Sequence, residues 1–164
     1  MAAPTISTEP RTIDLTSTAF GPGEPIPKGH TADGRNASPP LRWDDAPQGT
    51  KSLALVCEDP DAPRGTFTHW VVYNLPADTR ELGEGVPAKK ELPDGTRQGA
   101  NDFNKPGYGG PSPPPGKPHR YVFRLFALDT ALDLPAGATG ADLTAAVRGH
   151  AIGTGELIGV YGRS

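Results

Sequence analysis

The sequence has a single cysteine, Cys57, so it cannot form an intramolecular disulfide. It has no run of the roughly 18 apolar residues that a membrane-spanning helix needs, so we expect no membrane span. The 16 Lys and Arg residues and 19 Asp and Glu residues leave a formal net charge of −3, without a run of like charge. The basic cluster typical of a nucleic-acid-binding surface is missing, so we expect no nucleic-acid partner.

The opening segment, MAAPTISTEP, has neither the basic stretch nor the apolar stretch of a secretory signal peptide. We therefore expect a cytoplasmic protein, and we expect residues 1–10 to be flexible. The length suits one ordinary domain, so we treat residues 1–164 as a single domain.

Glycine and proline, by contrast, are abundant, with 21 and 20 residues respectively. Such a content approaches that of disordered chains, but the apolar segments described below argue against disorder. Short strands joined by many turns and long ordered loops fit this composition better than a helical bundle. We predict an all-β fold, an antiparallel β-sandwich with a C-terminal helix and long Gly/Pro-rich loops at residues 21–40 and 79–117.

Three segments have the alternating, β-branched and aromatic character of half-buried strands. They are SLALVCE (52–58), FTHWVVYNL (67–75) and RYVFRLFALD (120–129). We also expect an opening strand within residues 11–18 and a final strand over residues 156–162. Because Leu53, Leu55 and Cys57 share one apolar face, we predict that Cys57 is a buried structural residue.

One helix is expected near the end of the sequence. Thr139 and Asp142 have the spacing of a capping box, and the apolar residues that follow recur at helical spacing. Gly149 and Gly153 are candidates for ending this helix.

The sharpest local pattern is DPDAP at residues 59–63, where two prolines stiffen the chain beside the carboxylates of Asp59 and Asp61. Rigidly held acids suit a binding or acid–base site. Asp and Pro also end strands simply as turn residues, so the pattern alone leaves both interpretations open.

Two histidines occupy similar positions in the predicted strands. Period-two alternation places His69 on the face of Tyr73, and it places His119 with Tyr121 while Arg120 points away. A lone strand histidine is more often a structural residue, but the second histidine favours a shared site. We predict that both rings converge on one pocket beside the DPDAP carboxylates, with Arg120 outside it.

The segment GYGGPSPPPGKP (107–118) directly precedes the second histidine. Its glycines allow backbone N–H groups to form an anion-binding nest, and its prolines would stiffen the adjoining wall. A polyproline II surface segment or a linker would explain the same composition.

Three separated motifs occur in one order, namely NASPPLRWDDAP, EDPDAPRGTFTHWVVYNLP and GYGGPSPPPGKPHRYVFRLFALD. Together they resemble the phosphatidylethanolamine-binding protein family, specifically its bacterial branch of Raf kinase inhibitor-like proteins, over residues 15–161. The resemblance implies a β-sandwich with a small, metal-free pocket for phosphate, acetate or a phospholipid head group, and no cofactor. It also implies a homodimer and, by family analogy alone, modulation of a kinase or protease.

The resemblance transfers the family's ligand-binding pocket to particular positions of this sequence. These are Asp59, Asp61, His69, Gly109, Gly110, Pro111, His119 and Tyr121. Charged histidines would donate hydrogen bonds to ligand oxygens, so we expect anion affinity to fall as the pH rises. The sequence departs from its relatives at Ser112, where they often carry cysteine, and in the segment after His150.

Two alternative functions use the same residue types. A hydrolase or phosphatase could use the acids and histidines for general acid–base catalysis. No G-x-S-x-G, H-E-x-x-H or P-loop motif occurs, so we predict a protein that is not an enzyme and has no catalytic residues. The third hypothesis is a metal site, because the ligand types required for zinc are present at Asp59, Asp61, His69 and His119.

Overall fold

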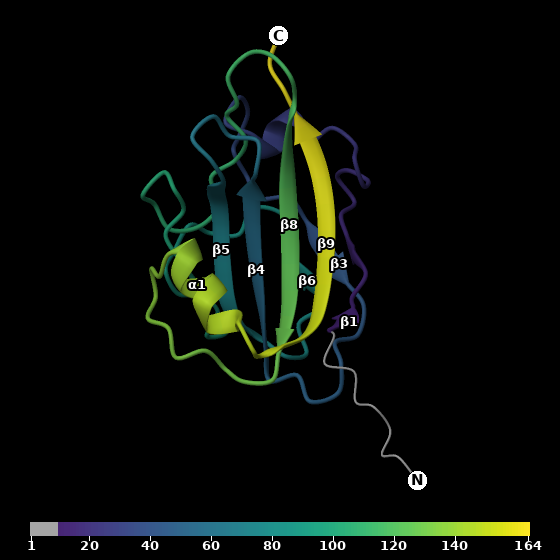
Figure 1. Cartoon of the computed structure of the whole chain (residues 1–164), viewed down its shortest axis with the longest axis vertical. Coiled ribbons are helices and arrows are strands. Elements are labelled where there is room, and N and C mark those ends of the chain that lie inside the picture. The colour runs from purple at the N-terminus through teal and green to yellow at the C-terminus, as the bar shows by residue number, and fades with distance from the viewer. Residues whose placement is uncertain (1–9) are drawn as a thin grey trace.

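A computed structural model describes residues 10–164, which form two β-sheets and one α-helix (Figure 1). The elements in chain order are β1 (Arg11–Thr12), β2 (Leu15–Thr16), the 3-10 helix η1 (Lys28–His30), β3 (Leu41–Trp43), β4 (Ser52–Asp59), β5 (Phe67–Pro76), β6 (Glu81–Leu82), β7 (Arg97–Gln98), β8 (His119–Leu128), α1 (Gly140–Val147) and β9 (Ala151–Tyr161). The predicted flexibility of residues 1–10 concerns residues that, apart from Pro10, lie outside the described part of the chain.

The larger sheet has six strands in the order β1-β9-β8-β4-β5-β7, and the smaller has three in the order β2-β3-β6. The long central strands pair antiparallel, as predicted. The edge strand β1 instead pairs parallel to β9, with Arg11 opposite Gly153, so the larger sheet is mixed. The predicted opening strand is in fact two short strands, because the chain leaves the larger sheet after β1 and joins the smaller one at β2.

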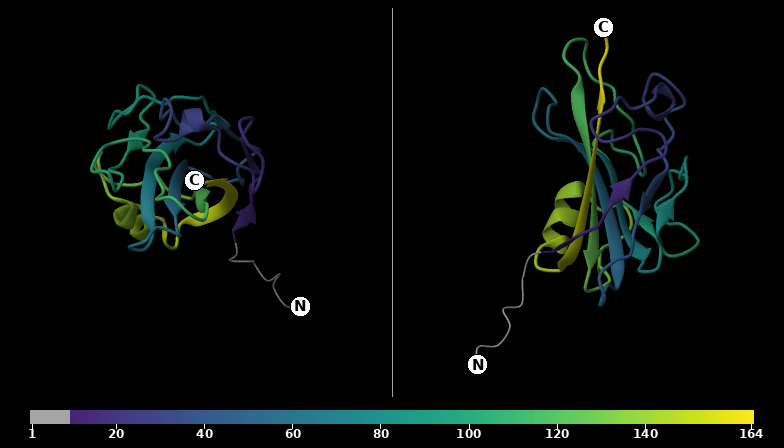
Figure 2. Two further views of the ribbon diagram at one scale, coloured as in Figure 1. Left: turned by 90° about the horizontal axis from the view of Figure 1, so that it is seen from above. Right: turned by 90° about the vertical axis from the view of Figure 1, so that its right-hand side faces the viewer.

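Both faces of the larger sheet are covered, which explains why seven of the eight residues of β4 are buried. One face packs against the smaller sheet through a core that includes Leu53, Leu55 and Cys57. The other face packs against α1 through Ala54 and Val56. Figure 2 shows α1 and the short strands on opposite sides of the larger sheet. Cys57 is 1% exposed, which confirms its predicted place in the core.

The predicted capping box of α1 is confirmed. The backbone N–H of Asp142 donates to Thr139 Oγ1, and the backbone N–H of Thr139 donates to Asp142 Oδ2, each at 3.1 Å. Gly149, with φ of +82°, follows the helix in the left-handed conformation that glycine accommodates.

The final strand is longer than predicted, because β9 begins at Ala151 rather than at residue 156. Gly153 therefore does not end the helix, and that prediction is wrong. It lies within β9, where a Cβ atom would come within 2.9 Å of Ile13 and Pro47 side-chain carbons. The glycine is needed there for close packing between strand and loop. Within residues 10–164, no helix is long and apolar enough to cross a membrane.

Candidate functional site

His69 and His119 line one cavity of about 150 Å³ at the end of the larger sheet, where β4 ends and both β5 and β8 begin. This histidine cavity has Asp59 and Tyr121 as its other ionisable lining residues. Apolar walls come from Ala62, Pro63, Phe67, Phe103, Pro113 and Pro114, and Ser112 adds a hydroxyl group. The structure thus brings together residues from five segments of the chain, namely 59–63, 67–69, Phe103, 112–114 and 119–121.

A buried carboxylate holds the ring of His119. Asp59 Oδ2 lies 2.7 Å from His119 Nδ1, and Asp59 is only 3% exposed. The other oxygen, Oδ1, accepts a hydrogen bond of 2.8 Å from the backbone N–H of Asp61. When the imidazole is protonated, the two side chains form an ion pair. The contact uses Nδ1, so His119 Nε2 remains available for a ligand.

A backbone carbonyl holds the ring of His69. His69 Nδ1 lies 2.6 Å from the carbonyl oxygen of Gly109. A carbonyl oxygen only accepts, so the proton of the neutral ring is on Nδ1 and Nε2 carries a lone pair. Burial lowers the pKa of His69 below its ordinary value of 6.5, against the smaller opposing effect of the Gly109 carbonyl. The expectation that both histidines act as cations is therefore wrong for His69 at neutral pH.

We expect the free energy of unfolding to decrease, through His69, as the pH falls below about 6.5. The unfolded chain takes up a proton at a higher pH than the folded protein does, so acid favours unfolding. Urea unfolding of the parent and of His69→Gln between about pH 8 and pH 5 measures this contribution. The variant should lose less stability over that range; equal losses in both proteins would contradict the assignment.

A β-bulge directs His69 into the cavity. Strict alternation along β5 would place His69 on the same face of the sheet as Tyr73, and Tyr73 packs in the core that faces α1. The His69 ring instead lies 5.2 Å from the ring of Tyr121, which belongs to the core between the sheets. In the β4–β5 ladder Cys57 pairs with Trp70 and the next pairing skips His69, so β5 carries an extra residue. Such bulges redirect side chains, often next to functional sites.

The Tyr121 hydroxyl makes no hydrogen bond of standard geometry among residues 10–164, although the Asp59 carboxylate lies close enough to raise its pKa. The side chain is 1% exposed, and burial raises the pKa of Tyr121 well above its ordinary value of 10.0, so the O–H group keeps its proton. Buried hydroxyl groups are rarely left unpaired in folded proteins. An unpaired donor on the wall of a cavity therefore indicates a place for an acceptor.

Asp61 does not line the histidine cavity, in contrast to the prediction. Its carboxylate accepts hydrogen bonds from the Arg120 side chain at 2.8 and 3.0 Å and from the Arg120 backbone at 2.9 Å. These bonds lower the pKa of Asp61 to about 2. Arg120 lies outside the cavity, as predicted. The Asp61 carboxylate, which is bonded to Arg120, also lies outside it.

The glycine-rich segment lies beside the histidine cavity rather than in it. Gly109 and Gly110 line a neighbouring cavity, and Pro111 lines neither of the two. The Pro111 carbonyl accepts a hydrogen bond from Ala32. His150 lies at the opposite end of the sheet, where its Nδ1 is 2.9 Å from Asp129 Oδ1. It is therefore not part of this site.

Sequence reasoning missed Arg163, whose hydrogen bonds hold the Ser112–Pro113 segment that lines the cavity. Arg163 donates to Asp33 at 2.6 and 3.0 Å, to the Pro113 carbonyl at 3.0 Å and to Ser112 Oγ at 3.3 Å. Hydrogen bonds from Arg163 and Tyr161 lower the pKa of Asp33 to about 2. No local pattern in the sequence could have indicated these contacts, whose partners are 50 to 130 positions apart.

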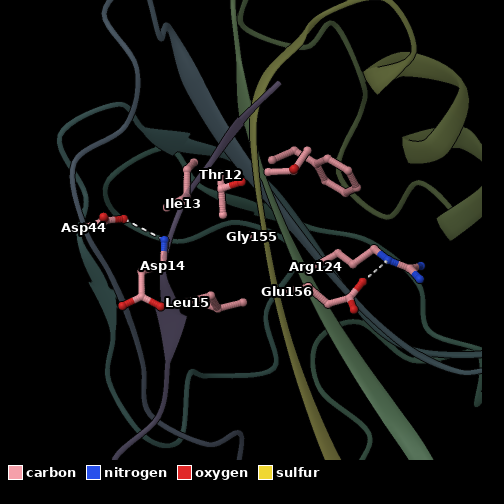
Figure 3. A pocket seen from close by; sticks show the side chains of 10 residues that line it. Thr12, Ile13, Asp14, Leu15, Asp44, Arg124, Gly155 and Glu156 are labelled. Carbon is pink, nitrogen blue, oxygen red and sulfur yellow. Dashed lines mark hydrogen bonds and ion pairs between the residues drawn. The ribbon is translucent and has the colours of Figure 1, made fainter. Parts of the chain in front are cut away.

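A larger groove of about 620 Å³ lies elsewhere, beside β1 and β9 (Figure 3). It contains the carboxylates of Asp14, Asp44 and Glu156 but no histidine. Its one cation, Arg124, already donates to Glu156 at 3.2 Å and to Glu58 at 3.3 Å. The lining of this groove therefore offers an anion three carboxylates and no unpaired cation, and the histidine cavity remains the candidate site. Within the described range, no cluster of three or more His, Cys, Asp or Glu side chains is arranged to hold a metal ion.

The family model for phosphatidylethanolamine-binding proteins matches residues 16–162 of this chain. The chain belongs to this family. Among similar relatives, a UPF0098 protein of Methanothermobacter thermautotrophicus is 52% identical over 151 residues, covering 92% of this chain and 99% of the relative. The UPF0098 protein YbhB of Escherichia coli is 43% identical, covering 91% and 99% respectively.

Solved structures of other phosphatidylethanolamine-binding protein homologues have the same fold. Escherichia coli YbcL, described as a member of the mammalian PEBP family, superimposes with a TM-score of 0.86 at 36% identity, covering 93% of this chain and 99% of YbcL. A homologue from Chlamydia trachomatis gives a TM-score of 0.84 at 40% identity, covering 94% and 99%. Neither the family description nor the names of these relatives describe an enzyme.

Proposed function

We propose that this protein binds a small oxyanion in the histidine cavity, either a carboxylate or a phosphate group such as that of a phospholipid head group. The observation that carries the proposal is the Asp59–His119 pair beside the unpartnered Tyr121 hydroxyl. A cavity of about 150 Å³ accommodates a small anion but is below the usual size of sites for drug-sized ligands. Membership in a family named for phospholipid binding supports the same class of ligand.

The site offers donors and one acceptor to such a ligand. Tyr121 is one donor, and His119 Nε2 is a second when the ring carries both protons, in which case Asp59 balances the charge of the imidazolium. His69 presents a lone pair on Nε2, because its Nδ1 proton is donated to Gly109. A phosphate group that keeps one proton matches this set, since its O–H can donate to His69 while its other oxygens accept. A carboxylate would fill the donor side and leave His69 to a water molecule.

Calorimetric titration with acetate and with inorganic phosphate, from about pH 6 to about pH 8, tests the proposal. Acetate is fully ionised over this range, so a loss of affinity with rising pH reports on the protein's donors. Inorganic phosphate still carries an O–H group for His69 after it loses its second proton, so its affinity should fall with rising pH as that of acetate does. Affinities that do not change with pH would overturn the proposed role of the charged histidine.

Tyr121→Phe separates binding from folding. Loss of one hydrogen bond should weaken acetate binding by about two- to tenfold. The unliganded variant should be at least as stable as the parent, because the hydroxyl has no partner to lose. A destabilised variant with unchanged acetate affinity would show that the hydroxyl serves the fold instead.

The hydrolase alternative lacks an activated nucleophile. Ser112 lines the cavity, but the side-chain partner of its Oγ is Arg163, not an imidazole. Nucleophilic catalysis by serine requires a hydrogen bond to its base. Modulation of a kinase or protease and a homodimer stay predictions from the family resemblance, and a cytoplasmic location stays a prediction from the opening segment of the sequence.

A further inference from the structure

A second cavity adjoins the histidine cavity. This side cavity has a volume of about 350 Å³, and Phe103 and Ser112 line both cavities, so these two side chains form the boundary between them. The lining of the side cavity includes one charged residue, Lys105, and no carboxylate. Lys105 is also the only Lys or Arg residue that lines either cavity. The electrostatics of the side cavity therefore favour a negatively charged occupant.

The Lys105 amine has no carboxylate partner among residues 10–164. Two arginines near the histidine cavity differ in this respect, because Arg120 and Arg163 each pair with an aspartate, at 2.8 and 2.6 Å. Asp102, in the same turn as the lysine, lines neither cavity. Its carboxylate accepts a hydrogen bond of 2.7 Å from the backbone N–H of Thr68. Lys105 is thus a cation that a ligand can pair with.

Asn101 fixes the turn that carries Lys105. Its backbone N–H donates to the Lys105 carbonyl at 2.9 Å. Its Oδ1 accepts from the backbone N–H groups of Phe103 at 2.9 Å and of Lys105 at 3.3 Å. Asn101 is only 4% exposed, and its amide nitrogen donates to the Gly107 carbonyl at 2.9 Å. One buried side chain therefore positions both the boundary residue and the cation on the cavity wall.

Two further lining residues of the side cavity can donate hydrogen bonds. Asn36 Oδ1 accepts from the backbone N–H of Gly110 at 2.7 Å, which leaves the Asn36 NH2 group without a protein partner among residues 10–164. Ser112 Oγ accepts from Arg163 at 3.3 Å, so its hydroxyl proton remains available. Carboxylate and phosphate oxygens accept such bonds, whereas an ammonium group can only donate. These donors therefore favour the same kind of occupant as the charge of Lys105.

We propose that the ligand carries two anionic groups, one in the histidine cavity and the second in the side cavity beside Lys105. A short linker would pass between them at Phe103 and Ser112. This inference rests on the proposed function and deepens it, because it assigns the ligand class as a small dicarboxylate or a phosphorylated carboxylic acid. A ligand whose second group is an ammonium would place a cation next to Lys105, and like charges at such a contact weaken binding.

Glutarate, monomethyl glutarate and γ-aminobutyrate are the probes, because they share a carboxylate and a linker of equal length but differ in the charge at the other end. In calorimetric titrations near pH 7, we expect glutarate to bind about five- to tenfold more tightly than its monomethyl ester, after correction for its two equivalent ends. The reason is that hydrogen bonds to charged groups are stronger than neutral ones. γ-Aminobutyrate should bind no more tightly than the ester.

Adipate and monomethyl adipate repeat the comparison with a longer linker. A diacid that binds no more tightly than its ester in both pairs would overturn the inference.

Lys105→Gln should bring the ratio of glutarate to ester affinity down to about one, and Lys105→Glu should make γ-aminobutyrate the tightest of the three probes. Lys105 is exposed, so the fold should tolerate both substitutions. The matched control is Lys51→Gln, which removes the same charge at the opposite end of the sheet, where the Lys51 backbone donates to the Leu128 carbonyl. This control should keep the parent ratio. A ratio retained in Lys105→Gln, or lowered equally in both Gln variants, would contradict the inference.

The outcomes distinguish this inference from the proposed function. Acetate that binds with the predicted pH dependence, combined with diacids that bind no more tightly than their esters, would overturn the second anionic group alone. Failure of acetate, phosphate and both diacids to bind would overturn the proposed function itself.

Discussion

Asp59→Asn should weaken acetate binding by about ten- to hundredfold at neutral pH. Simple electrostatics predicts the opposite, because the substitution removes a negative charge from an anion site. The structure places that charge on the far side of the imidazole, 2.7 Å from His119 Nδ1, where it balances the protonated ring. Hydrogen bonds to charged groups contribute about 1.5–3 kcal/mol, which corresponds to the expected loss.

Asp61→Asn is the matched control, because it removes the same charge two residues away. The Asp61 carboxylate bonds to Arg120 outside the cavity, so acetate affinity should stay within about twofold of the parent. Calorimetric titration of both variants is the measurement. Tighter acetate binding by Asp59→Asn, or equal losses in the two variants, would contradict the roles assigned to the two carboxylates.

Trp70→Ala should destabilise the fold by about 3–5 kcal/mol, a large share of the stability of a typical domain. Trp70 is fully buried next to the bulge that positions His69, and its ring packs 5.5 Å from that of Tyr108. Its Nε1–H donates to Gln98 Oε1 at 2.8 Å, so the substitution also leaves a buried acceptor without its donor. Urea unfolding followed by circular dichroism measures the loss.

Phe103→Ala is the control for Trp70→Ala. It also removes an aromatic side chain near the histidine cavity, but from a partly exposed position, so it should cost about 1 kcal/mol or less. A similar loss in both variants would mean that Phe103 supports the fold as much as the buried Trp70 does. The pair therefore separates a residue that holds the fold from one that we assign to ligand contact.

Local patterns in the sequence predicted the main elements of the fold. Runs rich in apolar, β-branched and aromatic residues located β4, β5 and β8 to within about one residue at their ends, because such residues suit a buried pleated sheet. The Thr139–Asp142 capping box located the start of α1, because both of its hydrogen bonds are local. The parallel pairing of β1 with β9 could not be predicted, since it joins segments from opposite ends of the chain.

The sequence by itself also determined which residue types could meet at the site, through the DPDAP motif and the two strand histidines. Only the tertiary structure decided their roles. A bulge turned His69 toward Tyr121, the Gly109 carbonyl oriented its ring, and Arg120 drew Asp61 out of the cavity while Asp59 stayed with His119. The physical reason is that strand periodicity does not encode a bulge, nor the three hydrogen bonds, whose partners are 40 or more residues apart.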